Sequence, residues 1–404
     1  MTLGKAIGRA LVWSLCFAIL VLPFVGGFPL AYVAMLLSVL SILWWLCNRP
    51  RWRELGDAGG LMTLGAFVLI AIAFAFSAKQ PGDMIFCLNF ALLALYPLIR
   101  ASVSRFAAPR NSLWVGLLAL AGVTVAAGVA LFQFEQGAAR PGGYMSDPIW
   151  AAQTAVIMGF TALIGLDATR SRWRFGLLLG PVLALLAVLL TQSRGPLLAI
   201  PLLLVGAWVF APRNRWPMIA AAVAGVVAIA LVWFAIPGAA ARVGSITDLL
   251  LRGGGGDQSI ATRVALYRGG FGAMLDSPAV GYGWSQIVAA TYAHVPGGRA
   301  AIEAADATML GDVHLHSDIL DLGVGAGALG LLAYVLTVIA PLVSALRSPR
   351  DAQFVGRLRG SVLLGAALFG CGLSYIMLGY ELPTTMFVCI GAIVTGLCRD
   401  VPAA

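Results

Sequence analysis

Apolar residues fill long stretches of this chain, and short clusters of Arg, Gly and Pro separate them. Because a helix needs about 20 apolar residues to cross the hydrocarbon core of a bilayer, each stretch predicts one membrane-spanning helix. The expected fold is an all-α polytopic integral membrane protein, with both termini on one side. Its twelve predicted helices cover residues 6–25, 28–47, 61–77, 84–99, 113–133, 148–166, 175–191, 196–211, 216–236, 317–345, 360–378 and 383–398.

The composition excludes a soluble enzyme, a disordered scaffold and a secreted disulfide-rich mini-domain. Hydrophobic residues make up 60% of the 404 positions and charged residues only 11%, whereas soluble domains carry about 25% charge. A water-soluble globule has too little interior to bury so much apolar surface.

The formal net charge of +9 would suggest nucleic acid if it lay on one soluble face. Twelve helices divide the connections into two sets, however, and 18 of the 26 Lys and Arg residues fall in the set that includes both termini. Positive connections stay in the cytoplasm. The charge therefore predicts cytoplasmic termini and no nucleic-acid partner, and Trp44 and Trp114 at predicted inner helix ends fit this orientation.

One connection is much longer than the others. It runs over residues 237–315, whereas loops usually have about 4–6 residues, and long loops are usually functional. All three histidines, His294, His314 and His316, lie in it or at its end. The chain is thus expected to comprise helices one to nine (1–236), an outer loop domain with short helices (237–315) and helices ten to twelve with the C-terminus (316–404).

Within this loop, Asp257 to Leu275 predicts an amphipathic helix that presents Arg263 and Tyr267 one turn apart. Arg268 lies on the same segment. These arginines either bind an anionic substrate or simply anchor the helix to lipid phosphates at the headgroup level.

Arg194 lies in Gln192–Pro196, a hairpin of a few residues between two very apolar helices. A charge so close to hydrocarbon is expensive, so it either faces a polar cavity or extends to the membrane surface. Arg140, in the connection Gly137–Pro141, is a weaker candidate of the same kind.

The histidines of Asp312–Asp318 permit two interpretations. If the segment is extended, its period of two aligns both histidines and both aspartates as a possible metal site. If Ser317 or a neighbour instead caps the tenth helix, Asp318 and Asp321 favour its N-terminal dipole and His316 is left at the entrance as a lone base. A merely structural interfacial histidine is the third possibility. Among the glycines, Gly323 and Gly327 predict close helix packing.

Nothing in the sequence predicts a cofactor. Gly253–Gly256 lacks a following Lys and indicates a hinge rather than a phosphate cradle. Outward arginines with a titratable histidine suit an anionic lipid-linked substrate, because guanidinium binds phosphate bidentately and imidazole can accept a proton near neutral pH.

Three motifs resemble the O-antigen ligase and polymerase superfamily. His316–Leu320, followed by Gly327 and Gly330, is similar to the family's His-Asn-x-x-Leu run, with Ser317 in place of Asn. Thr191–Gly195 resembles its Ser-Arg-Gly turn. Thr262–Arg268 and Pro278–Gly283 resemble its Arg-x-x-x-Trp helix and Pro-x-x-Gly-x-Gly turn, with Tyr267 in place of Trp.

The resemblance implies a GT-C-like glycosyltransferase of the bacterial inner membrane with a periplasmic active site. It would transfer O-antigen polysaccharide from undecaprenyl pyrophosphate to the lipid A core without a metal or other cofactor, most like a lipopolysaccharide O-antigen ligase. His316 would be the base and Arg194 and Arg263 would bind pyrophosphate. The expected substrate-binding residues are Arg140, Arg268, Tyr267, His314 and Asp318.

Three other functions are compatible with this pattern. A polymerase would join lipid-linked repeats with the same fold. A lipid-linked glycan transporter would use the outer arginines as a vestibule, although few ionisable residues lie in the middle of the predicted helices. A purely structural envelope subunit would be indifferent to changes in all of these residues.

Overall fold

The structure is a computed structural model that describes residues 3–48, 50–79, 81–145, 147–169, 171–211, 258–300 and 314–400, with isolated positions between 216 and 230. Most of the predicted ninth helix, 216–236, lies outside the described residues. The same is true of Gly253–Gly256, Asp312 and much of the 237–315 loop.

The described residues are largely helical and contain no strand. Within this described part of the chain, nine helical segments are long and apolar enough to cross a membrane, and Gly195–Val209 and Glu381–Leu397 are shorter apolar helices. The prediction of an all-α polytopic membrane protein is therefore confirmed. The elements are α1 (Leu3–Leu20), α2 (Pro23–Gly26), α3 (Pro29–Cys47), η1 (Trp52–Gly56), α4 (Ala58–Ser77), η2 (Pro81–Phe90), α5 (Ala91–Ser104), α6 (Asn111–Glu135), α7 (Pro148–Thr161), η3 (Ala162–Asp167), η4 (Arg172–Leu178), α8 (Leu179–Leu190), η5 (Gly195–Leu198), α9 (Ala199–Val209), α12 (Gln258–Asp276), η6 (Trp284–Gln286), α13 (Ile287–Ala293), α15 (Asp318–Leu346), α16 (Phe354–Gly372), α17 (Glu381–Ala392) and η8 (Ile393–Leu397).

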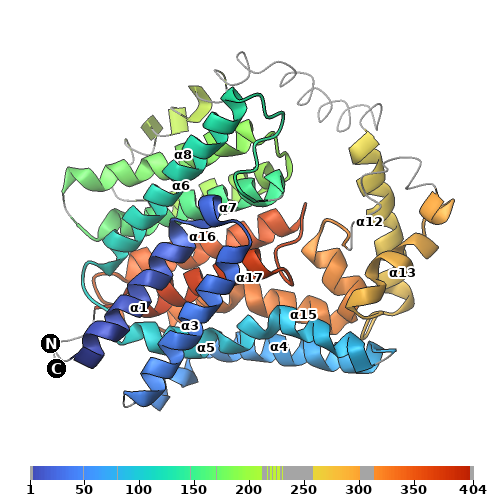
Figure 1. Cartoon of the computed structure of the whole chain (residues 1–404), viewed down its shortest axis with the longest axis horizontal. Helices are drawn as coiled ribbons and strands as arrows, with labels where there is room; N and C mark the ends of the chain where they lie inside the picture. The colour runs from blue at the N-terminus through green and yellow to red at the C-terminus, as the bar shows by residue number, and fades with distance from the viewer. Residues whose placement is uncertain are drawn as a thin grey trace.

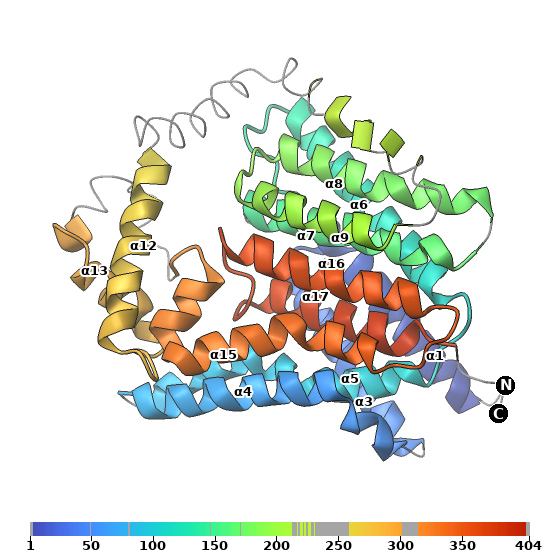
Figure 2. The same cartoon turned by 180° about the vertical axis from the view of Figure 1, so that it is seen from behind.

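The C-terminal helices lie in the middle of the molecule. In Figures 1 and 2, α16 and α17 run between a group formed by α6, α7, α8 and α9 and a group formed by α4, α5 and α15. Accordingly, α16 contacts α7, α9 and α15, and α17 contacts α3 and α5. The pair α12 and α13 stands at one edge and packs against α15. This arrangement brings segments distant in the sequence to one end of α16.

The boundary predicted for the eleventh helix is wrong, because α16 begins at Phe354 rather than at position 360. Arg357 and Arg359, which the charge pattern assigned to a connection, lie inside the helix with side chains only 0% and 1% exposed. Each is neutralised by a carboxylate: Arg357 pairs with Asp351 and Arg359 with Asp167, both at 2.7 Å. Helix can therefore continue through two cations that hydropathy alone treats as helix-ending.

The first residues of α15 form a separate helical piece. Gly327 breaks the helix with φ 59° and ψ −148°, a conformation open essentially to Gly. Close packing was expected of both glycines in this region. Both do pack closely: a Cβ added to Gly323 would lie 2.7 Å from the sulfur of Met274, and Gly327, which also makes the break, packs against the backbone of Ala279.

The Pro278–Gly283 turn repairs the hydrogen bonds that the break opens. Its amides donate to carbonyls before the break, and its carbonyls accept from amides after it. Non-helical backbone inside a membrane protein is tolerated where protein groups satisfy it in this way. The bonds run from the Tyr282 N–H to the Val324 carbonyl at 2.8 Å, from the Gly283 N–H to the Gly325 carbonyl at 2.9 Å and from the Ala328 N–H to the Pro278 carbonyl at 2.7 Å.

We expect Gly327→Ala to destabilise the protein by about 3 kcal/mol or more. The alanine would have a strained backbone at this φ, and its Cβ would lie 2.5 Å from the carbonyl carbon of Ala279. Gly65→Ala is the control, because a Cβ at Gly65, within α4, meets no atom within 4 Å. Thermal unfolding of both variants in detergent measures the difference. Equal melting temperatures would contradict the role assigned to the break.

Candidate active site

The turn before α15 carries both histidines of the motif. His316 has φ 57°, in the left-handed region, so the extended interpretation with a period of two is wrong. Its backbone N–H donates to Nδ1 of His314 at 3.2 Å, and the two rings lie 4.7 Å apart. A neutral imidazole that accepts at Nδ1 carries its proton at Nε2. The Nδ1 atom of His314 therefore serves to hold the turn.

The start of α15 uses its carboxylates differently from the expectation. Ser317 occupies the N-cap position with an extended backbone, but its side chain makes no capping hydrogen bond. Instead, the carboxylate of Asp321, in the first turn of α15, accepts a hydrogen bond at 2.8 Å from the backbone N–H of Leu315, which precedes the helix. Ser317 is thus the N-cap residue without a side-chain capping bond, and the acidic first turn is confirmed.

Residues 373–380, between α16 and α17, form a loop that we call the 373–380 loop. Hydropathy assigned most of it to a helix ending at 378, whereas α16 ends at Gly372. The Asp318 carboxylate accepts hydrogen bonds from the N–H groups of Met377 at 2.7 Å and Leu378 at 3.0 Å. Asp318 therefore fastens the loop beside the histidine turn.

Tyr267 joins α12 to the same place. Its hydroxyl lies 3.1 Å from the carbonyl oxygen of His316 and 3.3 Å from that of Leu373, at the start of the 373–380 loop. Burial raises the pKa of Tyr267, and the nearby Arg263 guanidinium, one turn earlier on α12, partly opposes that rise. The phenol thus remains a donor at neutral pH, and Arg263 lies near the histidine turn.

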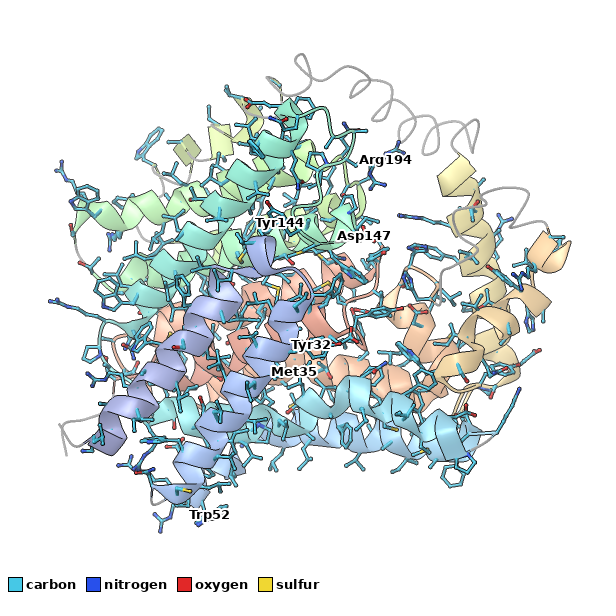
Figure 3. The ribbon with its side chains drawn as sticks, viewed as in Figure 1. Tyr32, Met35, Trp52, Tyr144, Asp147 and Arg194 are labelled. Carbon is cyan, nitrogen blue, oxygen red and sulfur yellow. The ribbon has the colours of Figure 1, made fainter. Side chains whose placement is uncertain are left out.

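The hairpin before η5 reaches the 373–380 loop from the opposite side. Gln192 adopts φ 55°, which confirms a tight reversal. A Cβ added to Gly195 would lie 2.5 Å from the hydroxyl oxygen of Ser374, so the hairpin packs closely against the loop at this position. Arg194 is half-buried, and Figure 3 shows it with Asp147 at the end of the α6–α9 group that faces α12. Three separate motifs therefore contact one loop.

The comparisons with known proteins address this same region. Residues 179–335 match the family model described as O-antigen ligase. The match runs from α8 to the second piece of α15, so it includes the hairpin, α12 and the histidine turn.

This match supports the resemblance to the O-antigen ligase and polymerase superfamily that the three motifs indicate.

The similarity implies an enzyme of the O-antigen ligase or polymerase type, and the apolar helices indicate a multi-pass membrane protein. The O-antigen ligase family implies, in general, a lipid-linked polysaccharide and the lipid A core as partners. A search of curated proteins found no match.

Aromatic residues that the motifs did not include surround the histidines. The Tyr375 ring lies 5.1 Å from the rings of both His314 and His316, and its hydroxyl donates to the Asp147 carboxylate. The Trp150 ring lies 5.6 Å from that of Tyr375. Asp147 had a local signal, because it precedes Pro148 and caps α7. Tyr375 had none, since it lay inside a predicted helix.

Two predicted substrate-binding arginines lie at the periphery. Arg140 is exposed and lines a hollow of ≈ 320 Å³ between the end of α6 and the start of α7. Arg268 is exposed on α12, whereas Arg263 and Tyr267 are half-buried on another side of that helix. Their roles stay predictions.

His294, at the end of α13, makes a pH-dependent contact with α12. Its ring nitrogens lie 3.0 Å from the Ala290 carbonyl oxygen and 2.8 Å from the Asp276 carboxylate. Hydrogen bonding to the Ala290 carbonyl, followed by that to Asp276, raises the pKa of His294. The charged form is thus favoured in the folded protein.

We expect this contact to stabilise the α12–α13 pair fully below the ordinary histidine pKa of about 6.5. Because the folded pKa is raised, the stabilisation is lost as pH rises through that raised value. Hydrogen exchange of the α13 amides across this window measures the loss. His294→Gln should remove the pH dependence, and an unchanged profile in that variant would contradict the assignment.

Proposed function

We propose that the protein is an O-antigen ligase. It transfers O-antigen polysaccharide from undecaprenyl pyrophosphate to a sugar hydroxyl of the lipid A core, on the periplasmic face of the bacterial inner membrane. The observation that carries this proposal is the meeting of three motifs at the 373–380 loop: Gly195 against Ser374, Tyr267 near the Leu373 carbonyl and Asp318 on the loop amides.

His316 is the proposed general base. It removes the proton from the acceptor hydroxyl, whose oxygen attacks the anomeric carbon of the donor sugar. A new glycosidic bond forms, the bond from that carbon to the pyrophosphate oxygen breaks, and undecaprenyl pyrophosphate leaves with the electron pair. The geometry favours His316 over His314, because the backbone N–H of His316 already occupies Nδ1 of His314.

Arg194 and Arg263 are the proposed pyrophosphate ligands. They stand on separate elements that reach the 373–380 loop region from two sides, and guanidinium groups can neutralise the charge that develops on the leaving group. Two fixed cations make a metal unnecessary in this scheme. Arg140 and Arg268, both exposed, are proposed to meet outer parts of the donor or acceptor.

Tyr267 and Asp318 are proposed as positioning residues. Tyr267 couples α12 to the carbonyl of His316, and Asp318 holds the 373–380 loop whose Tyr375 ring lies against both histidines. Each would act on the rate by fixing the imidazole rather than by touching a reacting atom.

The second candidate is the polymerase, which would use a second lipid-linked repeat as acceptor. The single long connection at 237–315 favours the ligase. Both termini are proposed to be cytoplasmic, in line with the charge of the connections.

Reconstitution with defined substrates tests the proposal. Purified protein in liposomes receives lipid-linked O-antigen and either lipid A core or a second lipid-linked repeat, with EDTA present in a parallel reaction. Polysaccharide on lipid A core, unaffected by EDTA, is the expected product. Elongated lipid-linked chains would instead identify a polymerase, and lipid flipping without a new glycosidic bond would identify a transporter.

A further inference from the structure

A groove far from the histidine turn lies between α1 and the start of α6. Its volume is ≈ 440 Å³, within the range of about 300–1,000 Å³ typical of small-molecule sites. Arg9 and Trp13 of α1 form one wall, and Asn111, Trp114 and Leu118 of α6 form the other. The groove is thus built from charged, amide and aromatic side chains together.

Both walls change from polar to apolar in the same direction. Arg9 precedes Trp13 by one turn on α1. Asn111, Trp114 and Leu118 follow the i, i+3, i+7 spacing of one helix face on α6. In Figure 1, α1 and α6 run away from the same edge of the molecule. The groove therefore offers a charged end at that edge and an apolar end deeper along the helices, as an amphiphile requires.

The end wall of the groove is rigid. The Phe106 ring packs at 4.9 Å from Trp44, whose indole N–H donates to the Gly4 carbonyl at 2.7 Å. The side-chain amide of Asn111 donates to the Phe106 carbonyl at 2.8 Å and to the Leu397 carbonyl at 3.1 Å. Four segments thus hold the groove open in a fixed shape, in contrast to a crevice between mobile side chains.

The charge at the polar end has one sign. Lys5 lies one turn before Arg9 on α1, and Arg110 directly precedes Asn111. All three cations are exposed. The positive-inside pattern predicts that this edge faces the cytoplasmic leaflet, where anionic lipids are concentrated and where basic pockets between helices bind their headgroups.

We infer that this groove binds an anionic phospholipid. The lipid phosphate lies at Arg9, within reach of the fields of Lys5 and Arg110, and an acyl chain follows Trp13 and Trp114 toward Leu118. The occupant is independent of the proposed ligase substrates, which meet the protein at the opposite, outer side.

Native mass spectrometry tests this site. The full chain is purified in detergent with equal amounts of phosphatidylglycerol and phosphatidylcholine, and bound lipids are counted. We expect selective retention of phosphatidylglycerol and about fivefold weaker retention in Arg9→Gln, since each cation near a membrane surface contributes a factor of this size. Arg347→Gln is the matched control, because Arg347 is an exposed cation at the C-terminus of α15, on the same predicted membrane side.

A second variant keeps the test decisive if Arg9→Gln fails to fold. Trp114 is 54% exposed, so Trp114→Ala removes a wall of the groove without opening the protein core. It should also lose the lipid while its melting temperature in detergent stays near wild type. Equal retention of both lipids, or equal losses in Arg9→Gln and Arg347→Gln, would overturn the inference.

Discussion

His316→Ala should lower the ligation rate by about 10²–10⁴-fold, the range that a general base contributes. The backbone of this turn is set by the left-handed conformation of His316 and by the carboxylate of Asp321, neither of which supplies a second base in place of the imidazole. The loss should therefore appear in kcat more than in KM. Product formation from lipid-linked donor and lipid A core by purified protein measures it.

His314→Gln is the matched control for this variant. A Gln side chain can still accept the hydrogen bond that the His316 N–H now donates to His314. We expect a smaller loss than in His316→Ala. The variant keeps the hydrogen bond that holds the turn, and the imidazole that it removes already accepts that bond at Nδ1. If the two variants lose activity in the reverse order, the base assignment is wrong.

Arg194→Lys should lower the rate by about 10²-fold or more although the formal charge is kept. Lysine presents a point charge on a flexible stem, whereas the guanidinium fork can hold two phosphate oxygens at once. The turn that carries Arg194 is fixed by Gln192 and by the contact of Gly195 with Ser374. The shorter, flexible lysine side chain therefore cannot recover the geometry by a backbone shift.

Comparison with Arg347→Lys separates this effect from a general effect of the substitution. Arg347 is exposed at the end of α15, and its replacement should leave the rate unchanged. Single-turnover rates at saturating donor provide the measurement. A rate for Arg194→Lys near wild type would show that charge alone is needed at this position and would remove bidentate pyrophosphate binding from the mechanism.

Local sequence information was sufficient for most of the fold. The predicted helices at 28–47, 148–166 and 317–345 agree with the structure to within a few residues. The helix expected from Asp257 to Leu275 is confirmed as α12. Apolar length decides these elements, because a helix satisfies its own backbone hydrogen bonds and needs no distant partner to do so.

Prediction failed where a distant partner overrides the local pattern. Hydropathy excluded Arg357 and Arg359 from a helix, yet ion pairs with Asp351 and Asp167 bury both. It also placed Tyr375 inside a helix, whereas Asp318, more than fifty residues earlier, binds the backbone of the loop that Tyr375 occupies. Asp351 lies only six residues before Arg357, but the Arg359–Asp167 ion pair and the bond from the Met377 N–H to Asp318 join residues that no sequence window contains together.

The candidate site, too, was predicted from the sequence only in part. Residue type and order pointed to Arg194, Arg263 and His316 as a group that suits an anionic lipid-linked glycan. Order along the chain could not tell that the hairpin, α12 and the histidine turn meet at the 373–380 loop, or that Tyr375 and Asp147 belong beside them.

The sequence by itself thus determined a multi-pass helical membrane protein and its similarity to the O-antigen ligase family over residues 179–335, because bilayer thickness and motif order act within short segments. Only the tertiary structure decided the break at Gly327, the left-handed turn at His316 and the loop that links the three motifs. These features depend on hydrogen bonds and backbone contacts between remote segments. Their stability arises only after the helices have packed, so no local pattern encodes them.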